Sequence, residues 1–151
     1  GTIFGTTGGV AEAVARRILS DKSKNALQVL QYSGLRGDGA IREVTLTVEG
    51  QELHIAIVNG LIHAKELIAD IEAGKRFYHL VEVMTCKGGC VGGAGQPYGL
   101  SAVKKQRGDG LYAADASAMF KRAEKNPIVT AMLADYGEEK CHELLHVRYG
   151  E

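Results

Sequence analysis

Two cysteines, Cys86 and Cys90, lie four residues apart in a glycine-rich segment, Thr85–Pro97, which we call the cysteine loop. Packing does not explain so many glycines, because each raises the entropic cost of ordering the loop and contributes no side-chain contact. Glycines do allow backbone N–H groups to come close to a bulky, electron-rich group. Thiolates in such a loop are typical ligands of an iron–sulfur cluster or another thiophilic metal. The alternative interpretation is two buried structural thiols beside a flexible loop.

A four-iron cluster takes four cysteine ligands, whereas this sequence contains three cysteines in total. The third, Cys141, lies near Leu144 and Leu145 in a predicted amphipathic helix, so we interpret it as a small hydrophobic residue of the core. Three cysteines, two of them close together, make a poor disulfide framework. They fit a reducing compartment, and we therefore expect a cytoplasmic protein.

A second candidate site is the H-E-x-x-H sequence formed by His142, Glu143 and His146. On a helix, two imidazoles at this spacing can bind zinc while the glutamate activates water. Few residues follow the motif, so a third zinc ligand would have to come from upstream, for example from His63, His79 or a carboxylate. The alternative is a core-packed helix whose dipole favours histidines near its C-terminal end.

A glycine turn near the start, Gly5–Gly9, could bind an anion at the N-terminus of the helix that follows it. It lacks the lysine of a phosphate-binding loop, so a tight turn into the helix is the alternative. Thr6 or Thr7 is the expected N-cap. The apolar residues of this helix recur at helical spacing and are expected to face the core: Val10, Ala13, Val14 and Ile18.

Composition limits the classes of partner. The 151 residues include 18 basic and 18 acidic side chains, for a formal net charge of zero. This balance argues against binding nucleic acid or an anionic membrane, because both need clustered basic residues. We find no apolar run long enough to span a membrane and no signal peptide. The length favours one domain, and the start without Met predicts a piece cut from a longer protein.

The segments before the cysteine loop predict an α/β fold. Apolar residues alternate with polar ones over 44–48 and again over 53–57, and the link Glu49-Gly50-Gln51 between them predicts an antiparallel hairpin. A helix is expected over Leu61–Ala73, with Gly74 just after its end. Its expected core face consists of Leu61, Ala64, Leu67, Ile68 and Ile71.

The run Phe77–Met84 is nearly continuous in apolar and β-favouring residues, which predicts a strand buried on both faces. Strand, helix and strand in this order predict a parallel βαβ crossover in a mixed sheet. Ligands collect beyond the carboxyl ends of the strands in open α/β sheets, and the cysteine loop starts there.

The rest of the chain is expected to be mostly helical. We predict a short helix near 26–31, a loop over Gly93–Gly110, and helices over about Leu111–Lys125, 126–137 and 138–149, with Asn126 and Pro127 starting the second of these three. We therefore expect a single domain that has an α/β part over about 1–97 and a helical tail over about 98–151.

These residues together carry a resemblance to a known family. The last of the three signature motifs of the iron-only ([FeFe]) hydrogenases is similar to residues 81–97, VEVMTCKGGCVGGAGQP. The glycine turn that precedes this motif in the family is similar to residues 3–13, IFGTTGGVAEA. The ending His142–His146 resembles the tail of the catalytic subunit, where it is not known as a zinc site. The resemblance spans essentially the whole chain and implies the C-terminal lobe of the catalytic domain of the large subunit.

The resemblance implies roles for five residues. Cys86 would ligate a [4Fe-4S] cluster, and Cys90 would ligate the same cluster and bridge it to a two-iron subcluster, the two forming the H-cluster. Phe4, Gly5 and Met84 would line the pocket of the two irons. The other cluster cysteines and the proton-relay cysteine lie upstream in the family, so no catalytic residue is expected within this chain.

The implied reaction is the interconversion of H2 with protons and electrons. Its implied partners are a redox carrier such as ferredoxin or other hydrogenase subunits, together with the remaining N-terminal part of the catalytic domain. Without that part, we expect the chain to lack the clusters and to be inactive.

The sequence departs from the family pattern at Thr85, Lys87 and Ala11, which keeps open a hydrogen-sensing or otherwise divergent member. The same cysteine motif occurs in related cytosolic iron–sulfur assembly proteins. The alternative to a hydrogenase is therefore a non-catalytic iron–sulfur sensor or an assembly-related domain, and a zinc hydrolase acting through His142, Glu143 and His146 is more remote.

Overall fold

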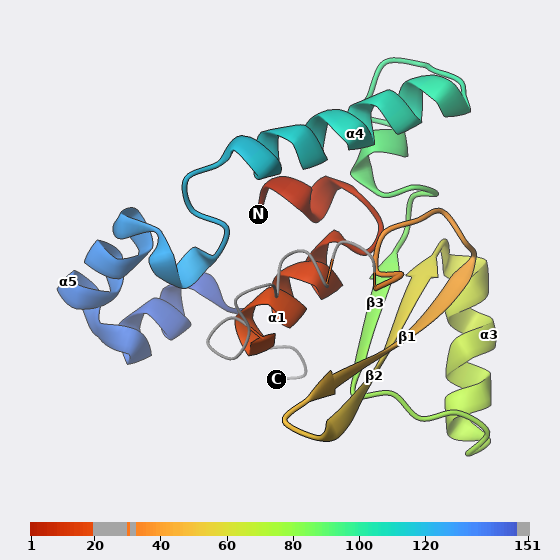
Figure 1. The fold of residues 1–151 in the computed structure, drawn as a ribbon, viewed down its shortest axis with the longest axis horizontal. Helices are drawn as coiled ribbons and strands as arrows, with labels where there is room; N and C mark the ends of the chain where they lie inside the picture. The colour runs from red at the N-terminus through yellow and green to blue at the C-terminus, as the bar shows by residue number, and fades with distance from the viewer. Residues whose placement is uncertain (20–29, 31–32, 148–151) are drawn as a thin grey trace. The chain divides into compact units, whose positions relative to one another are not determined.

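The computed structural model describes residues 1–19, 30 and 33–147 (Figure 1). The chain divides into two compact units, Gly1–Ser117 and Ala118–Glu151, and we describe each by itself. Among the described residues, no helix is both long enough and apolar enough to cross a membrane.

The first unit is built on a three-stranded mixed sheet with the strand order β1-β2-β3. Strands β1 (Ile41–Val48) and β2 (Gln51–Asn59) are antiparallel, with Val48 opposite Gln51. The turn residues Glu49 and Gly50 have φ of 51° and 81°, as a two-residue hairpin turn that matches strand twist requires. The predicted hairpin is confirmed.

Helix α3 (Leu61–Glu72) connects β2 to β3 (Leu80–Met84), and these two strands are parallel. The βαβ crossover and the α/β class are therefore confirmed. Gly74 has a φ of 69° and donates its N–H to the carbonyl of Ile71, so the predicted helix end is also confirmed.

Helix α1 (Gly9–Leu19) and helix α3 lie on opposite faces of the sheet (Figure 1). The side chains of β2 alternate between them. Ile55 and Ile57 point into a cluster on the α1 side, and Ala56 and Val58 point into a smaller one on the α3 side. The first cluster also contains Ala11, Ala15, Leu19, Leu30, Leu35, Val44 and Leu46, and the second contains Ala64 and Leu67.

The predicted core face of α1 is wrong. Ala11, Ala15 and Leu19 are buried, whereas Ile18 is 36% exposed. The reason is that α1 also buries two charged residues, Glu12 and Arg16, which pair with groups from distant segments. These ion pairs orient α1 about its own axis so that the side carrying Glu12 and Arg16 is buried together with Ala11, Ala15 and Leu19, instead of the predicted apolar face.

The predicted strand Phe77–Met84 is too long, and its burial on both faces is wrong. Strand β3 starts at Leu80 and forms an edge of the sheet, which leaves Val81 and Val83 exposed on the α3 side. The face of α3 was also predicted too broadly. Ala64 and Leu67 are its buried residues, and Leu61, Ile68 and Ile71 are exposed.

The predicted loop Gly93–Gly110 is wrong over most of its length, because α4 (Ser101–Ser117) begins ten residues before the predicted start of the helix at Leu111. Gly108 is buried in this helix and faces the methyl group of Thr6, which a Cβ at this position would meet at 3.5 Å. The packing of α4 against the short 3₁₀ segment η1 (Thr2–Gly5) overrides the low helix propensity of its glycines.

The second unit contains η3 (Ala123–Lys125) and α5 (Pro127–Leu145). Asn126 caps α5 by accepting the N–H of Ile128, as predicted, and Gly137 with φ of 76° kinks the helix where a helix end was predicted. Cys141 is buried, as expected, whereas Leu144 and Leu145 are each 61% exposed and do not face a core. The helix predicted near 26–31 lies outside the described residues except for Leu30.

Candidate metal centre

The cysteine loop begins where β3 ends, at the carboxyl end of the parallel strand pair. The N–H of Gly60 binds the carbonyl of Met84 at 2.7 Å and holds the last residue of β3 beside the end of β2. A turn then closes between Cys86 and Gly89, and the 3₁₀ segment η2 (Cys90–Gly92) follows. Both thiols are free and exposed, so the alternative of two buried structural thiols is wrong for Cys86 and Cys90.

The glycine turn lies directly against the cysteine loop. The N–H of Thr7 donates to the carbonyl of Gly88 at 3.3 Å. Gly89 has a φ of 90°, and a Cβ on it would lie 2.6 Å from the carbonyl oxygen of Gly5. Only glycine fits there, because two stretches of bare backbone approach each other at this point.

The three residues expected to line a pocket lie in or next to these two segments: Gly5 begins the glycine turn, Phe4 precedes it, and Met84 precedes the cysteine loop. Phe4 is 45% exposed, and Gly5 and Met84 are half-buried. A Cβ on Gly5 would lie 2.7 Å from a methyl group of Leu111, so a side chain there would require the Leu111 side chain on α4 to shift. The structure brings Gly5 beside the loop that carries the two thiols, through Gly89.

Two buried side chains that the sequence analysis missed bind these segments. The carboxylate of Glu82, on β3, accepts the N–H groups of Gly8 and Ala11 at 2.6 and 2.7 Å. The amide oxygen of Asn59, at the end of β2, accepts the N–H of Gly88 at 2.8 Å. The glycine turn does bind an anion, as one interpretation of it predicted, but the anion is the protein's own carboxylate.

The expected N-caps Thr6 and Thr7 do not cap α1. The hydroxyl of Thr6 donates to the carbonyl of Ile3 and also lies 3.0 Å from the hydroxyl of Tyr112. The buried hydroxyl of Thr7 has no hydrogen-bond partner among the described residues. A signal for the true cap was present in the sequence, since Glu82 is the single charged residue in the strand Leu80–Met84.

A buried ionic network holds α4 against α1. The carboxylate of Glu12 accepts one bond from Arg16 at 2.6 Å and two from Arg36, both at 2.7 Å. Arg16 also donates two bonds to Asp115 on α4, at 2.8 and 2.7 Å. Burial by itself lowers the pKa of Arg16, but the bonds to Asp115 and Glu12 outweigh it and raise the pKa.

Tyr112 joins this network to the glycine turn. The guanidinium of Arg36 lies 4.1 Å from the centre of the Tyr112 ring, and the phenol oxygen contacts Thr6. Burial raises the pKa of the Tyr112 phenol, so it stays neutral at physiological pH. The network therefore fixes α4, through Tyr112, over the segment that carries Phe4 and Gly5.

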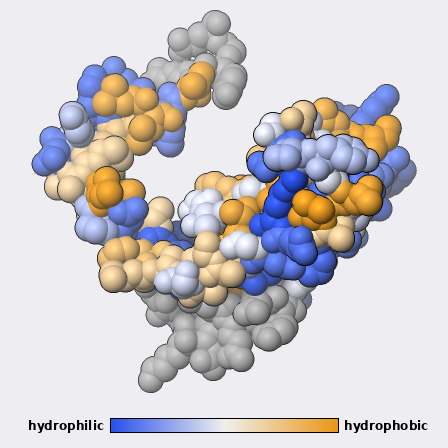
Figure 2. All heavy atoms as spheres, turned by 90° about the horizontal axis from the view of Figure 1, so that it is seen from above, coloured by the Kyte–Doolittle hydropathy of each residue, from blue (hydrophilic) through white to orange (hydrophobic). Residues whose placement is uncertain are grey.

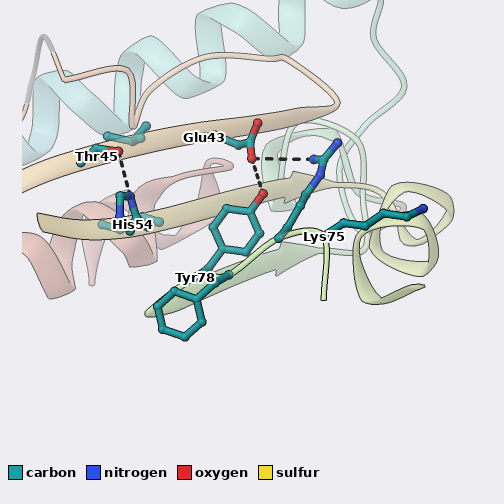
Figure 3. A pocket seen from close by; sticks show the side chains of 9 residues that line it. Glu43, Thr45, His54, Lys75 and Tyr78 are labelled. Carbon is teal, nitrogen blue, oxygen red and sulfur yellow. Dashed lines mark hydrogen bonds and ion pairs between the residues drawn. The ribbon is translucent and has the colours of Figure 1, made fainter. Parts of the chain in front are cut away.

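A hollow of about 370 Å³ lies on the α3 side of the sheet, at the end opposite the cysteine loop (Figure 3). Its polar groups pair with one another or with neighbouring side chains. Glu43 bonds with Tyr78 and lies 3.7 Å from Arg76, Thr45 bonds with His54, and Lys75 lies 3.4 Å from Asp70. The hollow is therefore not a candidate ligand site, because the polar side chains that line it are paired within the protein.

His142 and Glu143 lie on the last turns of α5, His146 follows the helix in an extended conformation, and all three are exposed. The rings of His142 and His146 pack edge to face, with centroids 4.3 Å apart, and Glu143 pairs with Lys140 at 2.8 Å. His63 lies 3.4 Å from Glu66, and His79 accepts the backbone N–H of His54. Within the described ranges, no three histidine, cysteine or carboxylate residues gather as a metal site requires.

The cysteine loop fits part of an iron–sulfur site. It presents two soft sulfur ligands, and Gly93 leaves open the space beside Cys86, since a Cβ there would lie 3.3 Å from the sulfur. Because no third metal-binding side chain gathers with the two thiols in the described part of the chain, these residues provide half of the ligands of a four-iron cluster.

Comparison with known proteins identifies the family. Residues 1–94 match the iron only hydrogenase large subunit, C-terminal domain, and residues 101–151 match the iron hydrogenase small subunit. The first match covers more than half of the chain and includes both exposed thiols.

Individual relatives agree with this match. The NADP-reducing hydrogenase subunit HndD of Solidesulfovibrio fructosivorans is 37% identical over 97% of this chain and 26% of its own length. The cytosolic Fe-S cluster assembly factor narfl of Danio rerio is 34% identical over 72% of this chain and 28% of its own length. A solved variant of apo [FeFe]-hydrogenase HydA1 from Chlamydomonas reinhardtii has a TM-score of 0.67 and 30% identity, covering 97% of this chain and 45% of that one.

The chain thus spans about a quarter of the length of these curated relatives and less than half of the solved structure. The fold of the solved hydrogenase agrees with the α/β architecture described above. As its signature motifs predicted, the chain belongs to the family of the iron-only hydrogenase large subunit, C-terminal domain.

Proposed function

We propose that this chain is the C-terminal part of a hydrogenase catalytic subunit, in which Cys86 and Cys90 bind iron. Cys86 would hold a [4Fe-4S] cluster, and Cys90 would hold the same cluster and link it to a two-iron subcluster. The supporting observation is a pair of exposed thiols in a glycine-rich loop after a parallel strand, in a chain of the iron-only hydrogenase family. When bound, the clusters supply the redox chemistry that interconverts H2 with protons and electrons.

The chain's own residues bind and shield this centre. The two thiols act as thiolates, and the backbone N–H groups of the surrounding glycines are available as donors to sulfur. Phe4, Gly5 and Met84 line the two-iron pocket, where Met84 provides a polarizable wall without an exchangeable proton. Lys87, one residue after Cys86 and exposed, adds a positive charge that favours the reduced, more negative cluster.

The rest of the same subunit is the first partner of this chain. It contributes the missing cluster ligands and the proton-relay cysteine, so the 151 residues alone are inactive and contain little or no iron. The exposed apolar residues of α3 and β3 support this proposal, because a monomer rarely leaves so many uncovered: Leu61, Ile62, Ile68, Ile71, Val81 and Val83. Hydrophobic residues lie exposed among hydrophilic ones on the surface shown in Figure 2.

Other partners follow from the family. Residues 101–151 match the small subunit, so this segment takes the place of a small subunit within the same polypeptide. Electrons pass to a carrier such as ferredoxin or to other hydrogenase subunits, in a reducing cytoplasm where the cysteines do not form disulfides.

The test replaces Cys90 by serine in the complete protein, purified without oxygen. We expect Cys90→Ser to lose hydrogen evolution and most of its iron, because the shared ligand of both clusters is gone. The matched control is Cys141→Ser, which removes a buried thiol of the second unit and leaves iron content and turnover largely intact. Retained activity in the first variant, or equal loss in both, would refute the assignment.

The alternative is a non-catalytic sensor or assembly-related domain, favoured by the similarity to the assembly factor narfl. Both functions predict iron at Cys86 and Cys90, so iron content does not separate them. Hydrogen turnover does, because a complete protein that holds its cluster but neither produces nor consumes H2 belongs to the alternative.

A further inference from the structure

Glu82 is a buried carboxylate placed between the two segments of the proposed site. It is 7% exposed, and its two oxygens each accept one backbone N–H, from Gly8 and Ala11. The distances of 2.6 and 2.7 Å are those of charge-assisted hydrogen bonds. Because α1 starts at Gly9, the carboxylate also lies at the positive end of the helix dipole.

The positions of these partners in the sequence show which parts of the proposed site the contact connects. Gly8 follows Phe4 and Gly5 by a few residues, and Glu82 precedes Met84 and Cys86 by two and four residues. A single side chain therefore connects the turn that carries one wall of the proposed pocket to the strand that carries the other wall and leads into the cysteine loop.

Two further side chains anchor the two sides of the same seam, where the glycine turn meets the cysteine loop, to other parts of the fold. Asn59, 4% exposed, binds the N–H of Gly88 through its amide oxygen and the carbonyl of Asp38 through its amide nitrogen. Arg42 donates to the carbonyl of Thr7 at 3.0 Å, and burial lowers the pKa of its guanidinium. The direct bond across the seam, from Thr7 to Gly88, is longer at 3.3 Å. Apart from that bond, each side of the seam is anchored separately, the glycine turn by Glu82 and Arg42 and the cysteine loop by Asn59.

We propose that Glu82 is a positioning residue, which sets the spacing between the glycine turn and the cysteine loop and so the shape of the site around Cys86 and Cys90. The effect of Glu82 on the cluster rests on the proposed function. The effect of Glu82 on the spacing of the two backbone segments does not require a bound cluster. Glu82 touches neither iron nor substrate and acts through the backbone that it binds.

The variant Glu82→Gln keeps the size of the side chain and removes one acceptor, since its amide nitrogen would face a backbone N–H. The readout is hydrogen–deuterium exchange in the complete protein, in peptides covering residues 1–13 and 85–93. We expect exchange about tenfold faster or more in both peptides, the size that follows from losing a charge-assisted bond. The matched control is Glu72→Gln, an exposed glutamate of α3, which leaves both peptides unchanged.

A role limited to capping α1 would accelerate exchange in the 1–13 peptide alone, and that result would overturn the proposal. Should Glu82→Gln not fold, Glu82→Asp keeps the charge with a side chain one methylene shorter. It must then accelerate exchange in the 85–93 peptide, by less than tenfold; no acceleration there would equally overturn it.

The second readout is the electron paramagnetic resonance spectrum of the reduced cluster. Glu82→Gln is expected to change its g-values while leaving bound iron unchanged. Unaltered g-values despite faster exchange at 85–93 would refute the consequence at the cluster. A wild-type protein without any cluster would instead refute the proposed function, and the exchange result would still decide the role of Glu82.

Discussion

The carboxylate of Glu12 lies between two guanidinium groups, and replacing it tests whether the buried network holds α4 in place. Glu12 is 1% exposed and accepts three hydrogen bonds, one from Arg16 and two from Arg36. In Glu12→Gln the side chain keeps one acceptor, and its amide nitrogen would face N–H groups of a guanidinium. One of the two carboxylate charges that compensate Arg16 is lost as well, and the other, on Asp115, remains.

The expected magnitude follows from these contacts. Hydrogen bonds to charged groups contribute about 1.5–3 kcal/mol each, and Arg16 keeps its two bonds to Asp115. We therefore expect Glu12→Gln to lower the local opening free energy of α1 and α4 by about 2 kcal/mol, well short of breaking a whole buried pair. This corresponds to roughly thirtyfold faster amide exchange, because about 1.4 kcal/mol is a factor of ten.

The assay is hydrogen–deuterium exchange in the complete protein, in peptides from 9–19 and 101–117. The matched control is Glu66→Gln on α3, whose carboxylate is 63% exposed and lies 3.4 Å from His63. An exposed pair of this kind contributes little, so its exchange should change by less than about threefold. Unchanged exchange in both helices of Glu12→Gln, or an equal change in the control, would show that the network does not hold them together.

Three further predictions concern single contacts. Gly89→Ala places a Cβ 2.6 Å from the Gly5 carbonyl oxygen at a φ of 90°, so the complete protein should lose bound iron. Gly95→Ala is the control and should keep its iron, because nothing lies within 4 Å of a Cβ at that position. Burial raises the pKa of Tyr112, so the stability that its neutral phenol contributes is full below the unfolded pKa of about 10 and is lost as the pH rises further. Tyr112→Phe should therefore remove this loss of stability at alkaline pH, measured by thermal unfolding over a series of pH values. A pH profile identical to that of the wild type would contradict this prediction. Asn126→Ala removes the 3.0 Å cap bond to Ile128 and should cost about 1 kcal/mol, read as faster exchange over 127–136, with Asn126→Ser as the conservative control.

The sequence was sufficient where structure is decided locally. The hairpin follows from alternating residues and a turn that needs positive φ, and the start of α5 follows from Asn126 and Pro127. The end of α3 follows from Gly74 for the same reason. Each of these signals acts within a few residues of itself, so no knowledge of the rest of the fold is required.

The sequence was insufficient where a residue is paired with a distant one. Glu12 and Arg16 lie in what reads as the polar side of α1. Asp115, the partner of Arg16, is 99 residues away in the chain. Glu82 lies in a run that predicts a strand without indicating any partner, yet the N–H groups that it binds, at the start of α1, are 74 and 71 residues earlier. Periodicity treats the charged residues of α1 as exposed and therefore assigned its core face wrongly.

Most of these failures concern groups that position the candidate site. Pattern and structure disagree at Glu82 beneath the glycine turn, at Glu12 and Arg16 behind it, and in α4, which covers it. A loop of bare glycines has few side chains with which to hold itself, so its shape must be imposed by charged groups buried beneath it. Such groups cost free energy unless they are paired. Here Glu82 is paired with backbone N–H groups of the glycine turn and of the start of α1, and Asn59 binds the backbone of the cysteine loop at Gly88. Positions where local sequence rules break down are expected at functional sites. In this protein such positions occur in the same region of the fold as the two thiols.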